Sequence, residues 1–565
     1  MKRAPREWVL PATELGRTGS AFERVARARG TTPALARAAA SATGEEHDPQ
    51  LLSDMDQAVR LVREAIRSGE TIAVYGDYDA DGVSACALLV RSLQAAGVEP
   101  IPYIPERESE GYGLNREALV ELRRRGAGLV ITVDCGTTAV DVVRERPSGL
   151  RLVITDHHLP HRQDGSAVVE LAPADALVNP QRPDDRYPFK GLAGVGVAYK
   201  LVRSLEAAGA VPPGTAADQL PLVALGTVAD MVPLQDENRW LVRQGLATWR
   251  ERAPLGLRRL AQGAGVDGTP TSSDLAFGLA PRINAAGRLD SAWLALRCCL
   301  AEEAAEAEES AGRLETLNRS RRDLLATALE EARATVAIMA DDLAVIALGS
   351  PALAPGVVGL VAGRLAEEYG RPAFIYSRSG EEWRGSGRGV PGLNVVEALR
   401  RCGALLSRYG GHQGAGGFSL VPGEAAAADF EAALALAVRD QLGDRSPSRT
   451  FPVDAEVGLG ECDLALAEDL LLLQPCGTGN PAVLLCASGC TVVRTDRLGH
   501  SGGHLKLMLA DATGTAEAVS FNRPQLRAHL PHGRRVDALF ELEVSRWRGR
   551  RKPQLLLRDL RPARS

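Results

Sequence analysis

Short apolar runs alternate with helical patterns through the first half of the chain. Three runs lead into an acidic residue: 71–75 into Asp77, 129–133 into Asp134 and 152–155 into Asp156. Segments with helical spacing of apolar residues lie among them, at 83–96, 116–125 and 139–146. Strands that alternate with helices predict a parallel sheet with right-handed crossovers. Such sheets bind ligands beyond the carboxyl ends of their strands, where these acids fall.

The flanking patterns predict further helices. Residues 1–50 are rich in Arg and Ala and are interpreted as a short helical arm and linker, and residues 55–66 have the spacing of an amphipathic helix. The apolar run 220–230 predicts a buried helix that ends near Asp230, because Pro233 follows closely. Residues 291–336, rich in Ala, Glu, Leu and Arg, predict one or two long connecting helices.

The second half divides into two further parts. Strand-like runs at 343–349 and 372–376, with a glycine-rich turn into a helix at 355–365, predict a smaller α/β domain. After a polar linker at 441–449, a helical piece lies near 464–473, and short alternating runs then predict a small β-barrel. The predicted domains are an arm (1–50), an α/β domain (51–290), a connecting helix (291–338), a second α/β domain (339–440) and a barrel (450–565).

Composition narrows the class of protein. The 565 residues carry a formal net charge of -5, so a nucleic-acid surface has to be local. The nine cysteines include no CxxC pair, which argues against a zinc site, and the odd number fits reduced thiols. No signal-peptide pattern and no long apolar span is evident, so we expect a cytoplasmic location.

The acidic and imidazole side chains define the candidate chemistry. The set comprises Asp77, Asp79, Asp81, Asp134, Asp156, His157, His158 and Asp230. Carboxylates with imidazoles favour Mn²⁺ or Mg²⁺ over thiolate-preferring zinc. The carboxylates outnumber what one ion uses, which indicates two ions about 3.5–4 Å apart and metal-dependent phosphoester hydrolysis.

Each motif has a plainer interpretation. Asp81 is a candidate helix cap, and the DxDxDG pattern resembles a calcium loop, although no Glu follows at the required offset. His157 and His158 taken alone are typical of surface positions.

The ordered motifs GDYDADG (76–82), VDCG (133–136), TDHH (155–158) and GTVAD (226–230) resemble the DHH phosphoesterase superfamily. Within it, the chain is similar to the RecJ single-stranded-DNA exonucleases. Further stretches carry the same resemblance: YIPERESEGYGL (103–114), FGLAPRINAAGRLDS (277–291), GVVGLVAGRL (356–365), GSGRGVPGLNVVEAL (385–399), GGHQGAGGF (410–418) and LQPCGTGNP (473–481).

The resemblance implies roles for the metal-site residues. Asp77, Asp79 and Asp134 would hold one ion, and Asp81, Asp134, His157 and Asp230 the other. His158 would contact the scissile phosphate, while Asp156 would orient an imidazole. Many superfamily members have His at the position of Tyr75, and Asp77 would supply the missing ligand here.

The resemblance also implies substrate-binding positions. Arg282 and Arg288 are expected phosphate contacts, with structural salt bridges as the rival interpretation. The second α/β domain resembles the DHHA1 module, with Arg364, Ser386, Arg388 and His412 as matching positions. Its glycine-rich stretch 410–418 is expected to be a loop that approaches phosphates. The barrel resembles an OB fold, where the basic and aromatic residues are expected to bind single strands: Phe521, Arg523, Trp547, Arg548 and Arg550.

The implied function is a 5′→3′ exonuclease that releases 5′-mononucleotides from single-stranded DNA during recombination and repair. The expected protein is a monomer that works with a helicase and a single-strand-binding protein. One rival is a DHH phosphodiesterase of cyclic dinucleotides or short oligonucleotides, which generally lacks a barrel. The other is a non-catalytic single-strand-binding scaffold, which predicts loss of the metal acids.

Overall fold

The computed structural model describes residues 1, 4–11, 18–41, 46–107, 110–111, 113–160, 169–341, 343–379, 382–422, 426–443, 448–499, 503–521, 523–547 and 550–563. The chain forms two compact units: residues 1–16 with 319–456, and residues 17–318 with 457–565. Within the described ranges, no helix has both the length and the apolar character needed to cross a membrane.

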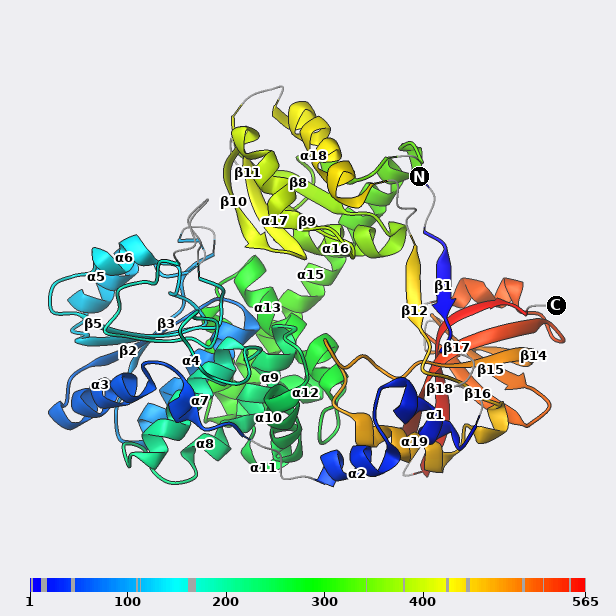
Figure 1. Ribbon diagram of the computed structural model, residues 1–565, viewed down its shortest axis with the longest axis horizontal. Coiled ribbons are helices and arrows are strands. Elements are labelled where there is room, and N and C mark those ends of the chain that lie inside the picture. Colours follow the sequence, from blue (N-terminus) through cyan, green and yellow to red (C-terminus); the bar gives the residue numbers. More distant parts are fainter. Residues whose placement is uncertain are drawn as a thin grey trace. The chain divides into compact units, whose positions relative to one another are not determined.

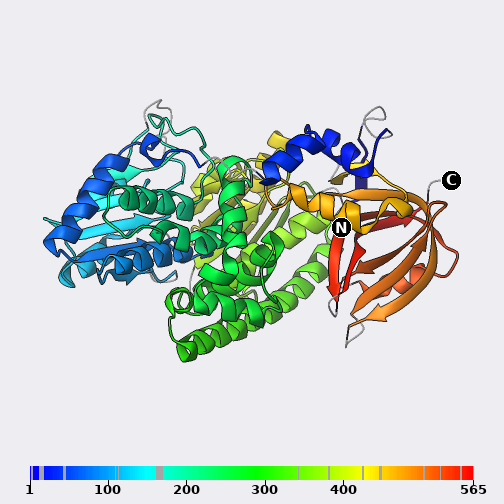
Figure 2. The same ribbon diagram turned by 90° about the horizontal axis from the view of Figure 1, so that it is seen from below.

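A five-stranded parallel sheet forms the core of the larger unit, as the sequence predicts. Its strands are, in spatial order, β3 (Ile101–Tyr103), β2 (Ile72–Gly76), β4 (Leu129–Val133), β5 (Arg151–Thr155) and β6 (Ala176–Val178). Alternate residues of β2 face opposite sides: Val74 joins one apolar cluster, whereas Ala73 and Tyr75 join another. Helices cover both faces, which explains why the strands read as continuous apolar runs (Figures 1 and 2).

The helices of this unit include each of the predicted ones. They are α1 (Ala21–Ala28), α2 (Pro33–Ser41), α3 (Met55–Ser68), α4 (Ala80–Ala95), α5 (Arg116–Arg124), α6 (Val140–Arg144), α7 (Gly194–Ala207), α8 (Thr215–Asp218), α9 (Leu220–Ala229), α10 (Asp236–Ala247), α11 (Trp249–Arg252), α12 (Leu255–Gly263), α13 (Ala280–Leu289) and α14 (Trp293–Leu300). Asp230 is the C-cap of α9, as predicted. A π-helical turn at Asp274–Leu279 precedes α13.

The long connecting helix α15 (Ala304–Ile338) belongs to both units. Its residues up to Asn318 are part of the larger unit, and those from Arg319 are part of the smaller one. Gly312 does not interrupt it, because the surrounding residues are strong helix formers.

The smaller unit holds a mixed five-stranded sheet. Its strands are, in spatial order, β10 (Leu406–His412), β11 (Ala415–Leu420), β9 (Glu382–Arg388), β8 (Ala373–Ser379) and β7 (Ile346–Gly349), with α16 (Val358–Tyr369), α17 (Val395–Arg401) and α18 (Ala426–Leu442) packed on it.

The prediction of a loop at 410–418 is wrong, because Gly410 and Gly411 pair with Gly417 and Gly416 in a β-hairpin. A side chain at Gly416 would lie 2.8 Å from Leu399 of α17, so the glycines serve close packing.

The prediction of a short helical arm and linker for residues 1–50 is wrong in part. Residues Arg6–Val9 form strand β1, which pairs in parallel with β12 (Arg449–Pro452). Strand β12 begins inside the stretch predicted as a polar linker. The partners lie over 400 residues apart, a pairing that local sequence patterns cannot reveal.

The last part of the chain is a closed barrel of five strands. These are β14 (Leu485–Leu498), β15 (His504–Ala510), β16 (Thr515–Ser520), β18 (Arg550–Pro562) and β17 (Arg535–Trp547) in spatial order, and β17 pairs back to β14. The predicted strands near 504, 516 and 554 are confirmed. The parallel pairing of β16 with β18 and the closure through β14 give the OB arrangement. Helix α19 (Leu464–Leu470) precedes the barrel.

Candidate metal centre

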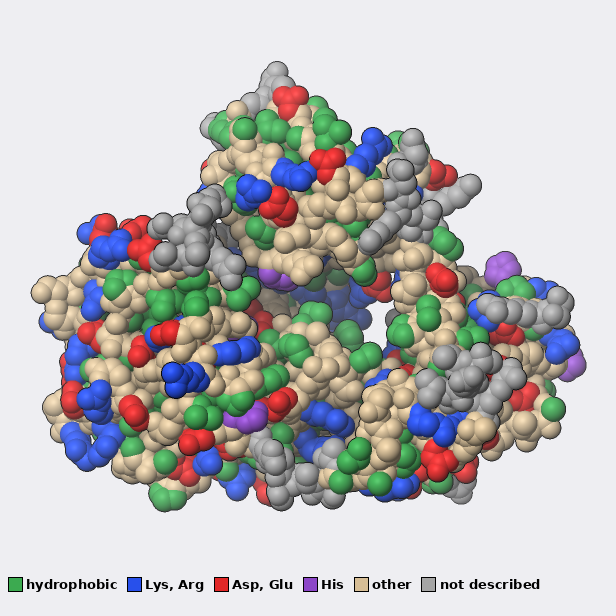
Figure 3. Space-filling view, viewed as in Figure 1, with side chains coloured by type: hydrophobic (Ala, Val, Ile, Leu, Met, Phe, Trp, Pro, Cys, Tyr) green, Lys and Arg blue, Asp and Glu red, His purple; other side chains and the backbone are tan. Residues whose placement is uncertain are grey.

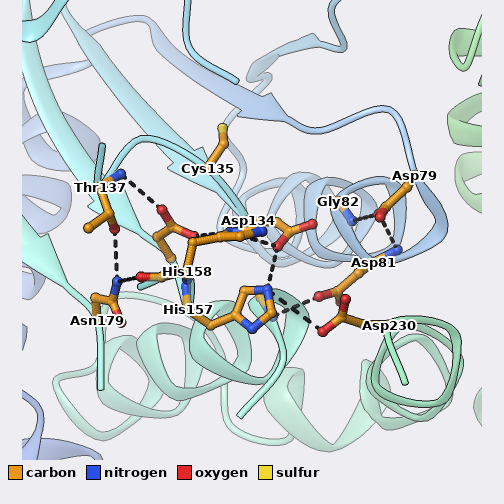
Figure 4. Close-up of polar contacts among 12 residues, drawn as sticks. Asp79, Asp81, Gly82, Asp134, Cys135, Thr137, His157, His158, Asn179 and Asp230 are labelled. Atoms are coloured by element: carbon orange, nitrogen blue, oxygen red, sulfur yellow. Dashed lines mark hydrogen bonds and ion pairs between the residues drawn. The ribbon is translucent and has the colours of Figure 1, made fainter. Parts of the chain in front are cut away.

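The predicted ligands gather at the carboxyl edge of the parallel sheet. Acidic residues follow β2, β4 and β5, and Asp230 comes from the end of α9 (Figure 4). The side chains form three groups whose ligand atoms lie within 4.8 Å of one another: Asp77, Asp79 and Asp134; Asp81, His157 and Asp230; and Asp134, His157 and His158. The third group shares Asp134 with the first and His157 with the second.

Asp134 is a buried carboxylate that belongs to two of these three groups. Its Oδ1 lies 3.0 Å from His157 Nε2, and its backbone has a φ of 61°. Burial, followed by the charges of Asp81 and Asp79, raises the pKa of Asp134 well above its ordinary range. The metal-free centre thus concentrates negative charge that a cation would relieve.

In the loop after β2, Asp79 and Asp81 accept hydrogen bonds from different helices. Asp79 caps α4, because its Oδ1 accepts from the amides of Asp81 (2.9 Å) and Gly82 (3.0 Å). Asp81 is not the cap; its carboxylate accepts from the amides of Gly194 (2.7 Å) and Val195 (3.0 Å) at the start of α7. Burial and the Asp230 charge raise the pKa of Asp81 to about 8.

Buried atoms without hydrogen bonds support a metal fit. Among the described residues, Asp77 Oδ1 is inaccessible to solvent and has no hydrogen-bond partner, and the equally inaccessible Asp134 Oδ1 and His157 Nε2 face each other at 3.0 Å without forming a hydrogen bond. An unsatisfied buried oxygen or nitrogen costs about 1–3 kcal/mol, so three at one edge need an explanation. Divalent cations that prefer oxygen and imidazole ligands fit this donor set.

Asp156 orients the second imidazole. Its Oδ1 accepts from His158 Nδ1 (2.8 Å) and from the backbone amides of His157 (2.7 Å) and His158 (3.1 Å), while Oδ2 accepts from Thr137 N (2.9 Å). Burial lowers the pKa of His158, but the hydrogen bond and charge of Asp156 outweigh it and raise that pKa to about 9. Asp156 therefore orients the His158 ring and favours its protonated form.

Tyr75 does not face the metal ligands. Its hydroxyl donates to Gly113 O (2.8 Å) and accepts from Asn115 Nδ2 (3.2 Å), and its ring stacks on Tyr103 at 5.3 Å on the other side of the sheet. Asp77, by contrast, lies with Asp79 and Asp134 in one ligand group.

Sequence reasoning missed four residues that shape this centre. A Cβ at Gly194 would lie 2.5 Å from Asp134 Oδ1, and one at Gly226 would lie 2.6 Å from Asp81 Oδ1. Asn284 Oδ1 accepts from Ala80 N (2.8 Å), and a Cβ at Gly287 would lie 2.8 Å from the carbonyl oxygen of Tyr78. Only glycine permits the three close approaches. Gly226 opens the GTVAD motif, and Asn284 and Gly287 lie in the INAAG stretch, so the sequence carried a signal for these three but none for Gly194.

The two predicted arginines of this unit occupy different settings. Arg282 is buried and bonds Glu315 (2.6 Å) and the carbonyl of Gly278 (2.6 Å). Burial raises the pKa of Tyr78 to about 12, and the nearby charges of Arg107 and Arg288 oppose that rise. Arg107 lies over the Tyr78 ring at 5.2 Å. Arg107 was not predicted, because only packing places it there.

The smaller unit brings Ser386 and Arg388 together. Arg388 Nη1 donates to Ser386 Oγ (2.9 Å), and both side chains lie against Gly359 at the start of α16. Burial lowers the pKa of Arg388, and no described carboxylate forms an ion pair with it. Arg364 pairs with Glu367 (3.4 Å), and His412 Nδ1 accepts from Gly414 N (3.2 Å). A half-buried cation beside a helix N-terminus suits an anion.

The barrel places one aromatic pair on its surface. Phe521 is 51% exposed, and its ring lies 5.0 Å from that of His504, which was not predicted. Arg523 donates to the carbonyl of Arg558 (2.9 Å). Trp547 and Arg550 face each other across the β17–β18 hairpin, but their side chains and Arg548 lie outside the described residues.

Two lysines lie on the neighbouring barrel strands. Lys506 of β15 and Lys552 of β18 each lie 2.7 Å from Glu517 of β16. On the face that Figure 3 shows, Lys and Arg side chains are interspersed with Asp and Glu side chains.

Three family models match the chain. The DHH family N-terminal domain covers residues 71–227, the DHHA1 domain covers 341–439 and the RecJ OB domain covers 453–559.

Curated relatives named single-stranded-DNA-specific exonuclease RecJ match over most of the chain. The one from Bacillus subtilis is 34% identical over 91% of this chain and 64% of its own length. The one from Dickeya dadantii is 34% identical over 91% of this chain and 92% of its own length. A solved structure of RecJ with Mn²⁺ from Thermus thermophilus is 31% identical, with a TM-score of 0.80 over 99% of this chain and 80% of that chain.

Proposed function

The chain belongs to the RecJ family of single-stranded-DNA-specific exonucleases, and from this premise we propose that it degrades single-stranded DNA in the 5′→3′ direction. The products would be 5′-mononucleotides, and the setting DNA recombination and repair. The observation that carries the proposal is the set of three overlapping ligand groups at one sheet edge, in which three buried side-chain atoms form no hydrogen bond. A single-strand-binding barrel in the same chain accords with it.

We assign the metal ligands as two sets. Asp77, Asp79 and Asp134 would hold one Mn²⁺ or Mg²⁺, and the other would be held by Asp81, Asp134, His157 and Asp230. The T. thermophilus RecJ structures contain Mn²⁺ or Mg²⁺. When bound, two such ions supply a hydroxide at neutral pH and neutralise charge on a phosphoryl group.

The chain's own residues would position the strand for that chemistry. His158, held by Asp156 Oδ1 at 2.8 Å, would donate a hydrogen bond to an oxygen of the scissile phosphate. Asp156 would keep the ring oriented and charged without touching the substrate. Gly194 and Gly226 hold the ligand carboxylates close to helices α7 and α9.

The test uses Mn²⁺ with single strands labelled at either end, a duplex and a cyclic dinucleotide, and EDTA as the metal-free control. Mononucleotide release from the 5′ end of single strands is the expected result. Release from the cyclic dinucleotide alone would instead support a small-substrate phosphodiesterase. Binding of single strands without cleavage would support a scaffold.

We expect Arg388→Gln to weaken substrate binding by about tenfold or more, because a hydrogen bond to a charged group contributes about 1.5–3 kcal/mol. Ser386→Ala should have a smaller effect. Arg384→Gln is the matched control, since Arg384 lies on the same strand, is exposed and pairs with Glu382 at 3.1 Å. KM and kcat for a single strand are measured, and equal KM values for the Arg388 and Arg384 variants would contradict the assignment.

On the barrel, Phe521→Ala is expected to weaken single-strand binding by about 1–3 kcal/mol through lost base stacking. Lys506→Gln should lower the salt dependence of binding by about 0.7 in log–log slope, because one phosphate contact is lost. Fluorescence anisotropy of a labelled strand across a salt series measures both. Leu471→Ala, which replaces another exposed apolar residue, should change neither.

The cellular setting is also proposed from the family. A helicase would supply the single strands, a single-strand-binding protein would hold them, and the enzyme would act as a cytoplasmic monomer. Sedimentation of the purified protein tests the monomer.

A further inference from the structure

The stretch LQPCGTGNP (473–481) stands out in the sequence but contributes no residue to the centre described above. It follows α19 and leads to β14, the first strand of the barrel, and it lies in the same compact unit as α10 (Figure 1). We refer to residues 472–480 as the strap.

Internal hydrogen bonds fix the conformation of the strap. Asn480 Nδ2 donates to the carbonyls of Leu473 (2.9 Å) and Pro475 (2.8 Å), and the backbones of Gly477 and Asn480 bond each other. Gly479 has a φ of 72°, which favours glycine. The turn is thus closed internally, and other carbonyls of the strap accept bonds from elsewhere.

These carbonyls contact the loop that follows the metal ligand Asp230. Leu234 N donates to Thr478 O (2.7 Å), and Gln235 Nε2 donates to Gly479 O (2.7 Å). A Cβ at Gly477 would lie 2.7 Å from Leu234 Cδ1, so the strap backbone packs directly on that side chain.

Two arginines of α10 complete the docking. Arg243 Nη2 donates to Gln474 O (3.0 Å), and Arg239 Nη2 donates to Leu472 O (3.1 Å). Burial lowers the pKa of both guanidinium groups. Partly buried charges are costly unless they are hydrogen-bonded, so these arginines favour a docked strap over a released one.

The docking point is close to the chemistry. Leu234 follows Asp230 by four residues, a separation that spans at most about 14 Å. We propose that the strap couples the OB barrel to the metal centre, with Arg239 and Arg243 as positioning residues. With the strap docked, the barrel keeps a constant position relative to the metal centre while it presents successive phosphates of the single strand. This consequence rests on the proposed exonuclease function, whereas the docking itself does not.

The experiment compares the parent with three variants of the full chain. Arg239→Gln/Arg243→Gln removes the charged donors, Arg239→Lys/Arg243→Lys is the conservative control, and Gly477→Leu removes the close approach to Leu234. Hydrogen exchange at the Leu234 amide reports docking. Nucleotides removed per binding event, from a long strand with excess unlabelled trap, report coupling. The cleavage rate of a trinucleotide and the Mn²⁺ affinity report the centre alone.

We expect the Gln pair and Gly477→Leu to exchange faster at Leu234 and to remove about tenfold fewer nucleotides per binding event, because linked sites lose effective concentration. Trinucleotide cleavage and Mn²⁺ affinity should stay within about twofold of the parent, and the Lys pair should behave as the parent.

Faster exchange with an unchanged run length would overturn the inference, as would unchanged exchange in both disruptive variants. An equal loss on both substrates would also overturn it, because the strap would then support the fold and not the coupling. A parent that cuts neither substrate would refute the proposed function instead, and exchange would still decide the docking.

Discussion

Replacing Asp134 with Asn is expected to reduce exonuclease activity by about a thousandfold or more and to stabilise the metal-free protein. Asp134 is common to two of the three ligand groups, so its loss removes several kcal/mol of metal-derived transition-state stabilisation. Asn tolerates the φ of 61° at this position, so the fold should persist.

The stability gain follows from the raised pKa. A buried carboxyl with a raised pKa favours folding below about pH 4, and that contribution is lost as pH rises towards the folded-state pKa. The metal-free parent should therefore lose stability above about pH 4, and Asp134→Asn should lose less. At pH 7 we expect a gain on the order of 1 kcal/mol.

Nuclease assays with Mn²⁺ and thermal unfolding with EDTA measure the two effects. Asp141→Asn is the matched control, because Asp141 is exposed on α6 and pairs with Arg144 at 2.7 Å. That change should leave activity intact and shift stability by less than about 0.5 kcal/mol. An Asp134→Asn variant that is less stable without metal than the parent would contradict the charge argument.

Replacing Asp156 with Asn is expected to lower kcat by about 10–100-fold without removing a ligand, the range typical of residues that orient a metal-site histidine. The His158 ring would lose its charged partner, so its pKa should fall from about 9 towards the ordinary 6.5. Titration of the His158 ring by NMR measures this pKa and distinguishes a loss of His158 orientation from a general loss of fold.

The same variant should be less stable by about 2–4 kcal/mol at pH 7, because four donors lose a carboxylate acceptor. The pKa of Asp156 is lowered in the folded protein, so its contribution is present above about pH 4 and disappears in acid. Parent and variant should therefore converge in stability at low pH.

Asp175→Asn is the control for Asp156. Like Asp156, Asp175 accepts hydrogen bonds from the backbone, but its donor is Leu152 N (2.7 Å) at the start of β5, whereas Asp156 follows the end of that strand. It should lose stability and keep its kcat. If the Asp156 variant kept the parent kcat and His158 pKa, Asp156 would not be the orienting residue.

The sequence by itself determined the parallel sheet and where its site lies. The acids Asp77, Asp134 and Asp156 each follow an apolar run, and parallel strands end on one edge. This inference needs only local patterns and the handedness of crossovers, and the structure confirms the parallel sheet. The helix that ends at Asp230 and the barrel strands were likewise encoded in local periodicity.

Only the tertiary structure decided how each group is held. Asp79 caps α4 while Asp81 bonds the start of α7, although both belong to one DxDxDG pattern. The glycine-rich stretch at 410–418 became a hairpin because α17 packs against it. The strap at 472–480 was visible as a motif, but its partners on α10 lie more than 200 residues away. Sequence patterns report the period of an element, whereas its partners depend on packing between segments distant in the chain.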